Sequence, residues 1–222
     1  MTDSRQSRIY NRWPVAKEGL PFIAFGLGAF SLFSIVGLGI LAALMGLLTL
    51  FTAFFFRDPE RSYSPSPGTV LSPADGKLLD VRPVEARQNP LNESAFKISI
   101  FMSLFDVHVN RVPVGGRIEE VTHHRGNFFS ANLDKASLLN EKNIITLSTA
   151  SGQRVVWIQI AGLVARRIAC WTRPGDQVVG GQRFGLIRFG SRLEVYLPMT
   201  AEITAKNGQK MRAGETVIGY LP

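Results

Sequence analysis

An uncharged run of 36 residues, from Pro21 to Phe56, limits what this chain can fold into more than any other feature. The polar side chains within it are all small hydroxyls: Ser31, Ser34, Thr49 and Thr52. A soluble domain of 222 residues has no need of such a run. A signal peptide has an apolar core of about 7–15 residues that ends at a small-residue cleavage site, whereas this run ends FFFRDPER. We therefore expect residues 21–56 to be embedded in a membrane.

The length of this run predicts two helices rather than one. A single helix would extend about 54 Å, against a hydrocarbon core of about 30 Å. The segment Ser34–Gly39 lies at the middle of the run and contains two glycines, so it can turn the chain and give a hairpin of two short helices. The alternative is one long, tilted helix.

Basic residues lie on both sides of the apolar run. The residues are Arg5, Arg8, Arg12 and Lys17 before it, and Arg57 and Arg61 after it. By the positive-inside rule, both ends of the run face the cytoplasm. The formal net charge of +8 fits the same interpretation, because basic residues beside a membrane anchor attract anionic lipid. No zinc-finger spacing or aromatic–basic RNA motif is present, so we expect no nucleic-acid partner.

Composition divides the chain into two parts. Residues 1–64 form a basic leader, the membrane segment (about 21–56) and a proline-rich linker, and residues 65–222 form a polar domain. Short runs rich in β-branched and aromatic residues, such as 95–102 and 153–160, indicate strands throughout that domain. The one helix candidate is Leu133–Asn143, with Asp134 as its cap. We predict a mainly β (α+β) fold, a small hybrid barrel or sandwich carrying an N-terminal helical hairpin.

A glycine pattern occurs twice near the C-terminus. Gly175–Gly181 and Gly208–Gly214 share the spacing G-x-x-h-x-x-G, 33 residues apart. Lipoyl and biotinyl carrier barrels use this pattern at their hairpin turns, where glycine adopts positive φ. The repeat therefore predicts a small barrel whose two halves are related by approximate symmetry. A carrier domain also needs a lysine in an exposed turn, and Lys135 lies far from the repeat, so we expect the architecture without the carrier function.

The usual catalytic and metal-binding motifs are missing from the sequence. Cys170 is the only cysteine, which excludes a disulfide framework and a cysteine-based metal cluster, and we expect no metal site. There is no G-x-S-x-G elbow, P-loop or dinucleotide fingerprint. What remains is Gly190-Ser191, inside the segment RFGSRLEVYLP. In isolation such a pair is a simple turn between two strands.

Six sequence segments, one of them the Gly190-Ser191 pair itself, occur along the chain in the order of a known family. They are FFRDPER (55–61), SPADGK (72–77), FMSLFDVHVNR (101–111), DKASLLNE (134–141), QIAGLVARR (159–167) and GS (190–191). With them the chain resembles the phosphatidylserine decarboxylase family, in its short bacterial branch, over nearly its whole length. The resemblance implies a proenzyme that cuts itself between Gly190 and Ser191. The products are a β chain, 1–190, that keeps the anchor, and an α chain, 191–222, that stays paired with it.

The implied chemistry makes physical sense of Gly190 and Ser191. The serine hydroxyl attacks the preceding carbonyl, the ester so formed eliminates, and Ser191 becomes an N-terminal pyruvoyl group, the covalent cofactor. Glycine before the serine leaves the attack unobstructed and tolerates a distorted backbone. The pyruvoyl group then forms a Schiff base with the amine of phosphatidylserine and accepts electrons as CO2 leaves, giving phosphatidylethanolamine in phospholipid biosynthesis. The resemblance places the protein at a bacterial inner membrane, with the catalytic domain on the cytoplasmic side and a homo-oligomer possible.

His108 and Asp75 complete the catalytic set that the resemblance implies. His108 is the candidate for proton transfer, with an ordinary pKa of about 6.5, and Asp75 for orienting or activating a base during self-cleavage. Each has a structural alternative, since Asp before Gly is common in turns and a histidine beside a strand is often structural. Longer members have a second histidine where this chain has Arg111, which cannot act as a base near neutral pH. Either His108 serves both steps, or His124, less readily His123, takes the cleavage role.

Other interpretations stay open. Arg111, Arg166, Arg167 and Arg192 are possible contacts for phosphate or carboxylate, although solvated surface arginines are commoner. A membrane-anchored barrel that binds lipid without catalysis predicts an intact chain. A carrier domain predicts a modified lysine, and a pyruvoyl decarboxylase for a soluble amino acid is disfavoured by the membrane run.

Overall fold

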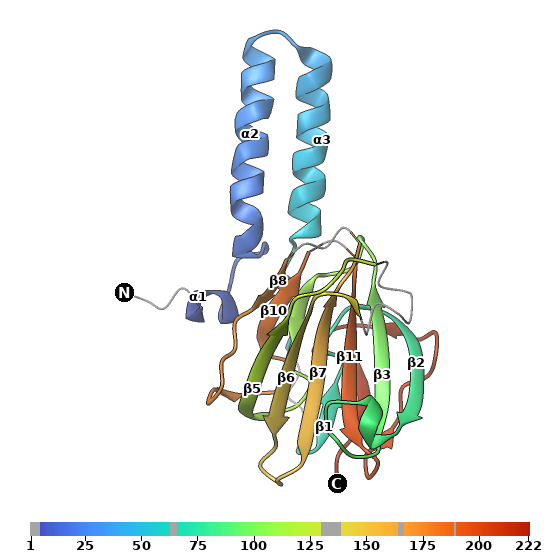
Figure 1. Cartoon of the computed structure of the whole chain (residues 1–222). Coiled ribbons are helices and arrows are strands. Elements are labelled where there is room, and N and C mark those ends of the chain that lie inside the picture. The colour runs from blue at the N-terminus through green and yellow to red at the C-terminus, as the bar shows by residue number, and fades with distance from the viewer. Residues whose placement is uncertain (1–4, 63–65, 130–138, 164–166, 189) are drawn as a thin grey trace.

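In a computed structural model of the chain, two long helices form a hairpin that stands on a β domain (Figure 1). The structure describes residues 5–62, 66–129, 139–163, 167–188 and 190–222. Its helical elements are α1 (Gln6–Ile9), η1 (Lys17–Gly19), α2 (Leu20–Ile35), α3 (Gly39–Phe55) and η2 (Ala86–Gln88). The predicted hairpin is confirmed, and the single long helix is wrong. The chain reverses at Gly37, whose φ of +80° suits glycine.

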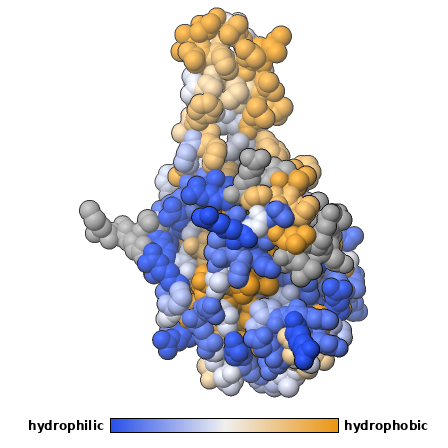
Figure 2. Space-filling model, in the orientation of Figure 1, coloured by the Kyte–Doolittle hydropathy of each residue, from blue (hydrophilic) through white to orange (hydrophobic). Residues whose placement is uncertain are grey.

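Small residues let the two helices approach closely. A Cβ at Gly26 of α2 would collide with the hydroxyl of Thr49 in α3, while a Cβ at Gly28 would meet open space. Thr49 donates its hydroxyl to the carbonyl of Met45 at 2.7 Å, so no polar group is left unsatisfied at this contact. Most of the other side chains of the hairpin point outward, and Figure 2 shows an apolar surface over its upper part. The helical stretch Lys17–Ile35 is long and apolar enough to cross a membrane, and α3 is shorter.

The β domain is built on a curled sheet of eight antiparallel strands, in the order β13-β2-β3-β11-β7-β6-β5-β9 (Figure 1). Two three-stranded sheets, β1-β14-β12 and β4-β10-β8, accompany it. The strands are β1 (Thr69–Leu71), β2 (Gly76–Val84), β3 (Ala95–Met102), β4 (Val109–Arg111), β5 (Gly116–His124), β6 (Lys142–Ser148), β7 (Arg154–Ala161), β8 (Ile168–Cys170), β9 (Gln177–Val178), β10 (Arg183–Ile187), β11 (Ser191–Pro198), β12 (Glu202–Ile203), β13 (Lys210–Met211) and β14 (Val217–Tyr220). The mainly β fold class is therefore confirmed.

The glycine repeat forms the two edges of the large sheet. β9 belongs to the first copy and β13 to the second, and each is a two-residue strand at one end of the strand order. Gly181 and Gly214, which close the two copies, have φ values of +82° and +72°. A Cβ at Gly214 would lie 3.3 Å from the Cα of Gly181, so the two turns meet back to back. The two copies therefore occupy matching places at opposite edges of the sheet, and the symmetry of the two halves stays a prediction.

The helix expected over Leu133–Asn143 falls mostly on residues 130–138, which lie outside the described residues. Its last two residues, Lys142 and Asn143, begin strand β6, so the predicted end of that helix is wrong. Lys142 pairs with Ile160 and Asn143 with Gln159 of β7, and this strand pairing overrides any local helix preference.

The leader and the linker run side by side at the base of the hairpin. Val15 and Arg57 form an antiparallel bridge, and the amide of Ala16 donates to the carbonyl of Phe56 at 2.8 Å. Below them the buried carboxylate of Asp58 accepts hydrogen bonds from Asn11 and from Arg183, both at 2.9 Å. The segment that follows the membrane run is therefore bound to the β domain by specific pairs.

Candidate active site

Ser191 is the first residue of β11, at the end of the sheet that faces the hairpin. It pairs with Met102, the last residue of β3, and with Ala161, the last residue of β7. Its side chain is buried, and its hydroxyl lies 3.3 Å from the sulfur of Met102. Gly190 has a φ of +61° and nothing near its would-be Cβ, so the bond between the two residues lies at a sharp bend with free space beside it.

A chain of buried amides leads away from Met102. Asn110 of β4 donates to the Met102 sulfur at 3.6 Å and accepts from Gln159 of β7 at 2.8 Å. Gln159 in turn accepts from Asn143 of β6 at 3.2 Å. Sequence analysis missed this network, although a glutamine inside the apolar strand VVWIQIA is a visible signal of a buried polar contact. The network fixes the strands that surround Ser191.

His108 lies just before β4 and is fully buried. Its imidazole lies against Phe55, the last residue of α3, with ring centroids 4.0 Å apart. Neither ring nitrogen has a hydrogen-bond partner within the described part of the chain. Burial lowers the pKa of His108 to about 4, and Asp106 offsets part of this effect. The imidazole is therefore neutral near pH 7 and able to accept a proton.

Asp75 is held by Arg61 from the linker. The two guanidinium nitrogens donate to its carboxylate oxygens at 2.5 and 2.8 Å, and the backbone amide of Ala213 donates at 2.8 Å. Burial alone would lower the pKa of Arg61, but the hydrogen bond and the charge of Asp75 outweigh it and raise that pKa. Both residues line a cleft of about 330 Å³ at the base of the hairpin, together with Asp106. Asp75 makes no recorded hydrogen bond to His108 or Ser191 among the described residues.

Arg111, at the position where longer relatives have histidine, has a structural contact. It donates to the carbonyl of Gly181 at 2.9 Å and to that of Pro59 at 3.0 Å, so it ties the linker to the glycine turn. Burial, followed by the charge of Arg183, lowers the pKa of Arg111 to about 10. It remains a cation near neutral pH.

His123 and His124 are exposed on β5, and β6 and β7 separate that strand from β11. Three strand spacings are about 14 Å, so neither histidine contacts Ser191. This separation argues against both histidines in the cleavage role, and the role of His108 stays a prediction.

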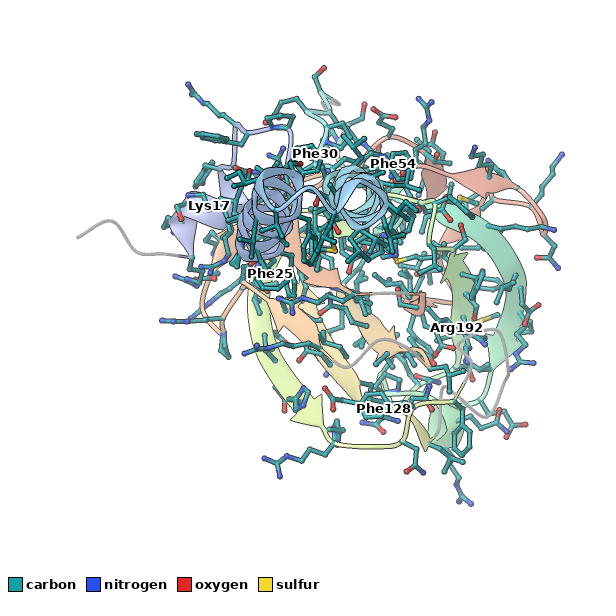
Figure 3. All side chains as sticks on the ribbon, turned by 90° about the horizontal axis from the view of Figure 1, so that it is seen from above. Lys17, Phe25, Phe30, Phe54, Phe128 and Arg192 are labelled. Atoms are coloured by element: carbon teal, nitrogen blue, oxygen red, sulfur yellow. The ribbon has the colours of Figure 1, made fainter. Side chains whose placement is uncertain are left out.

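The remaining arginines have different environments. Arg192 is buried, contrary to the commoner expectation of a solvated arginine, and donates to Ser99 at 3.0 Å beside Glu194. Arg167 is exposed, and Arg166 lies outside the described residues. Seen from the hairpin side, Arg192 and Phe128 lie in the part of the β domain away from α2 and α3 (Figure 3).

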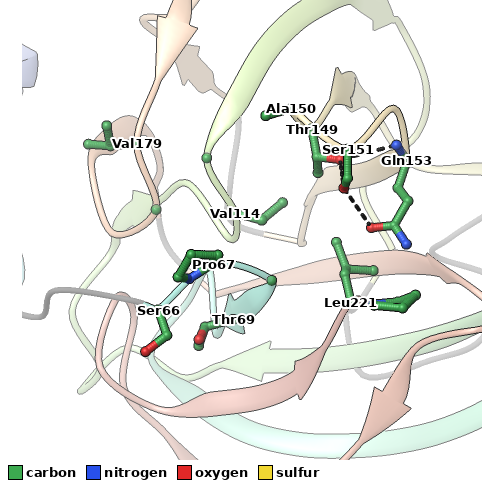
Figure 4. A pocket seen from close by; sticks show the side chains of 14 residues that line it. Ser66, Pro67, Thr69, Val114, Thr149, Ala150, Ser151, Gln153, Val179 and Leu221 are labelled. Carbon is green, nitrogen blue, oxygen red and sulfur yellow. Dashed lines mark hydrogen bonds between the residues drawn. The ribbon is translucent and has the colours of Figure 1, made fainter.

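A second hollow, of about 480 Å³, lies at the end of the domain remote from the hairpin (Figure 4). Thr69, Val114, Gln153 and Leu221 are among the residues that line it. None of its described lining side chains is ionisable, and it contains none of the predicted site residues. The candidate active site is therefore at the hairpin end.

Known proteins of one family resemble this chain over most of its length. The family model for phosphatidylserine decarboxylase matches residues 48–219. A protein of Pelobacter propionicus is 48% identical over 216 residues, which cover 94% of this chain and 97% of that protein. One of Desulfotalea psychrophila is 43% identical over 208 residues, with the same coverage. Both are named phosphatidylserine decarboxylase proenzyme. The chain belongs to the phosphatidylserine decarboxylase family.

Proposed function

We propose that this protein converts phosphatidylserine into phosphatidylethanolamine after cutting itself between Gly190 and Ser191. The observation that carries the proposal is the bent, unobstructed Gly190 beside a buried Ser191 at the hairpin end of the sheet. Family membership supports it, because the relatives are named as decarboxylase proenzymes.

Self-cleavage begins when the Ser191 hydroxyl attacks the carbonyl carbon of Gly190, turning the amide into an ester. Elimination across Cα and Cβ of residue 191 releases Gly190 as a carboxylate and leaves dehydroalanine. Water then displaces ammonia, and residue 191 becomes a pyruvoyl group. The residues present fit this outcome, since residue 191 is held on both sides by Met102 and Ala161 and the strand has no need to leave the sheet.

The two products stay together by strand pairing. The α chain, 191–222, supplies β11 between β3 and β7, the edge strand β13, and β14 between β1 and β12. Leu193, Val195 and Leu197 of β11 are fully buried in the main core. Removing a central strand would expose this core, so the β and α chains form one folded unit.

In the reaction, the pyruvoyl group supplies an electrophilic carbonyl that takes the amine of the substrate and accepts the electrons released with CO2. The neutral imidazole of His108 moves the proton, and its contact with Phe55 keeps it away from bulk water. Asp75, held by Arg61 in the cleft beside Asp106, acts on the histidine through its negative charge rather than through a hydrogen bond. The negative charge of Asp75 favours the protonated imidazole and so raises the pKa of His108.

Membrane attachment completes the proposal. The helices α2 and α3 extend about 25 Å, close to the thickness of one hydrocarbon core. Basic residues at both ends of the hairpin support a catalytic domain on the cytoplasmic side of the inner membrane. Attachment brings the site to a substrate that is confined to the membrane.

The test is intact-mass spectrometry of the purified protein under denaturing conditions. We expect two chains that separate after Gly190, the smaller one lighter by one ammonia than a fragment starting with serine. Ser191→Ala is expected to give one inactive, full-length chain, whereas Ser151→Ala, in an exposed turn, is expected to be processed normally. A single unmodified chain in folded wild-type protein would contradict the proposal and favour a lipid-binding barrel.

The role of His108 needs its own test. In correctly processed protein, His108→Ala is expected to slow decarboxylation by about 100-fold or more, the usual contribution of a general acid or base. His124→Ala changes an exposed histidine and is expected to leave the rate unchanged. Normal turnover by processed His108→Ala would remove His108 from the mechanism.

A further inference from the structure

A basic hollow lies at the base of α2, on the side of the leader. Its volume is about 670 Å³, and its walls come from α1, the start of α2, β8 and the residue after β10. Figure 2 shows hydrophilic residues gathered around the base of the hairpin, directly below its apolar part. This hollow contains neither Ser191, His108 nor Asp75, and the proposed reaction does not use it.

Positive charge in this hollow exceeds negative charge. The basic residues that line it are Arg5, Arg8, Lys17, Arg167, Arg173 and Arg188, and Glu18 is the one acidic lining residue among those described. Arg8 pairs with Glu18 at 2.6 Å, and Arg5 pairs with Asp176 at the same distance. The other four cations have no carboxylate partner in the described parts of the chain. Burial lowers the pKa of Arg188, and the charge of Arg167 lowers it further, so an anion placed here would relieve a repulsion.

The hollow lies where the polar leader becomes the apolar helix. The guanidinium carbon of Arg188 lies 5.3 Å from the ring centroid of Phe22, in the first turn of α2. Lys17 begins the helical stretch Lys17–Ile35 that is long enough to cross a membrane. If α2 enters a bilayer, these cations lie at the level of the lipid headgroups, where basic residues attract anionic lipid.

Strand β10 separates the hollow from the serine. Leu186 packs in the cluster below the hairpin with Phe55, whereas Ile187 packs against Ala161, the strand partner of Ser191. Neighbouring residues along an extended chain point to opposite sides, so Arg188 points to the same side as Leu186 and away from Ala161. A phosphate in the hollow is therefore across the strand from the reacting carbonyl.

We propose that this hollow binds the phosphate headgroup of an anionic membrane lipid that is not the substrate, of the phosphatidylglycerol class. Lys17, Arg167, Arg173 and Arg188 supply the charge, and Phe22 lies beside the first carbons of the lipid. The inference rests on the membrane attachment proposed above. Bound lipid of this kind fixes the depth and the angle at which the β domain meets the bilayer.

The experiment compares lipids on the full-length, processed protein in detergent micelles, by native mass spectrometry after equilibration with phosphatidylglycerol or with phosphatidylcholine. We expect one phosphatidylglycerol to be retained in preference to phosphatidylcholine, and the preference to fall as salt is raised. Arg167→Gln with Arg188→Gln is expected to weaken retention by about 25-fold, since each cation near a lipid surface contributes about fivefold. Arg87→Gln removes one positive charge from an exposed arginine of η2, outside the hollow, and this control is expected to behave as wild type.

Three results would overturn the inference. Equal retention of the two lipids would remove the preference for an anion. Displacement of phosphatidylglycerol by millimolar inorganic phosphate would make the hollow a site for a soluble anion. If the double variant loses decarboxylation but retains phosphatidylglycerol as wild type does, the hollow is a substrate site. Flotation with phosphatidylcholine vesicles tests membrane attachment separately, so its failure is distinguishable from failure of the lipid preference.

Discussion

The ring of Phe55 lies against the imidazole of His108, with 4.0 Å between the ring centroids. Phe55 is the last residue of α3, so the apolar hairpin ends directly on the histidine proposed to move the proton. Phe55, Val107 and Trp171 belong to one buried cluster that joins the leader, the hairpin and the β domain. The membrane segment is thus part of the wall of the site.

Phe55→Ala is expected to raise the pKa of His108 from about 4 towards its ordinary value of about 6.5, because water reaches the ring. The measurement is an NMR titration of ring-labelled histidine, in a chain with three histidines. Phe54→Ala, which removes a more exposed ring at the same helix end, is the control. If the pKa of His108 is unchanged in Phe55→Ala, groups other than Phe55 exclude water from the imidazole.

The low pKa of His108 predicts a loss of stability in acid. The unfolded chain binds a proton at His108 below about pH 6.5, whereas the folded chain does so only below about pH 4. The free energy of unfolding therefore falls by about 3 kcal/mol between these two pH values, and this group adds no slope above pH 6.5. The free energy of unfolding is measured against pH for the uncut Ser191→Ala protein, with and without His108→Gln, and the difference between the two curves gives the contribution of His108. The same slope in both proteins would refute the assignment.

Arg61→Gln is expected to destabilise the fold by about 3–5 kcal/mol, because it leaves the carboxylate of Asp75 buried without its cation. Arg212→Gln is the matched control in the same cleft. The Arg212 side chain is 70% exposed and, within the described parts of the chain, forms an ion pair only with Glu215, so its loss is expected to cost less than about 1 kcal/mol. Urea unfolding in micelles gives both values, and equal values would mean that the Arg61–Asp75 pair is as solvated as the surface pair.

Gly26→Leu is expected to lower the midpoint of thermal unfolding, because the new side chain collides with Thr49 across the hairpin. Overpacking of this kind costs about 1–3 kcal/mol. Gly28→Leu adds the same side chain at a position with open space and is expected to be neutral. If the two variants unfold alike, the helices of the hairpin do not pack as described.

Much of the architecture could be predicted because its signals are local. The length of the uncharged run and its central glycines predict the hairpin, and the glycine repeat predicts two turns, which lie at the two edges of the sheet. Strand β2 was missed, since its sequence GKLLDVRPV carries charges and a proline, and pairing with β3 decides its structure.

The site could be predicted only in part. Ser191, Gly190, His108 and Asp75 come from a family resemblance, and their catalytic roles stay predictions. The segment RDPER looks like a structureless linker because its partners are distant: Asp58 binds Arg183, and Arg61 binds Asp75. Burial of Arg111 depends in the same way on carbonyls that come from other parts of the chain. Local patterns carry no information about such contacts.

The turn of the hairpin bears on which leaflet of a membrane would receive the product. Ile35, Val36, Gly37 and Leu38 carry no polar side chain, and the amides of the last three donate to carbonyls within the turn. The first amides of α3 have no side-chain cap, so we expect the tip to reach polar headgroups or water at the far surface of a bilayer. Because the hairpin carries no charged side chain, insertion from one side would move no charge across the membrane, and the proposed reaction would release phosphatidylethanolamine into that leaflet alone. Supplying the opposite leaflet would require a separate lipid-translocating step.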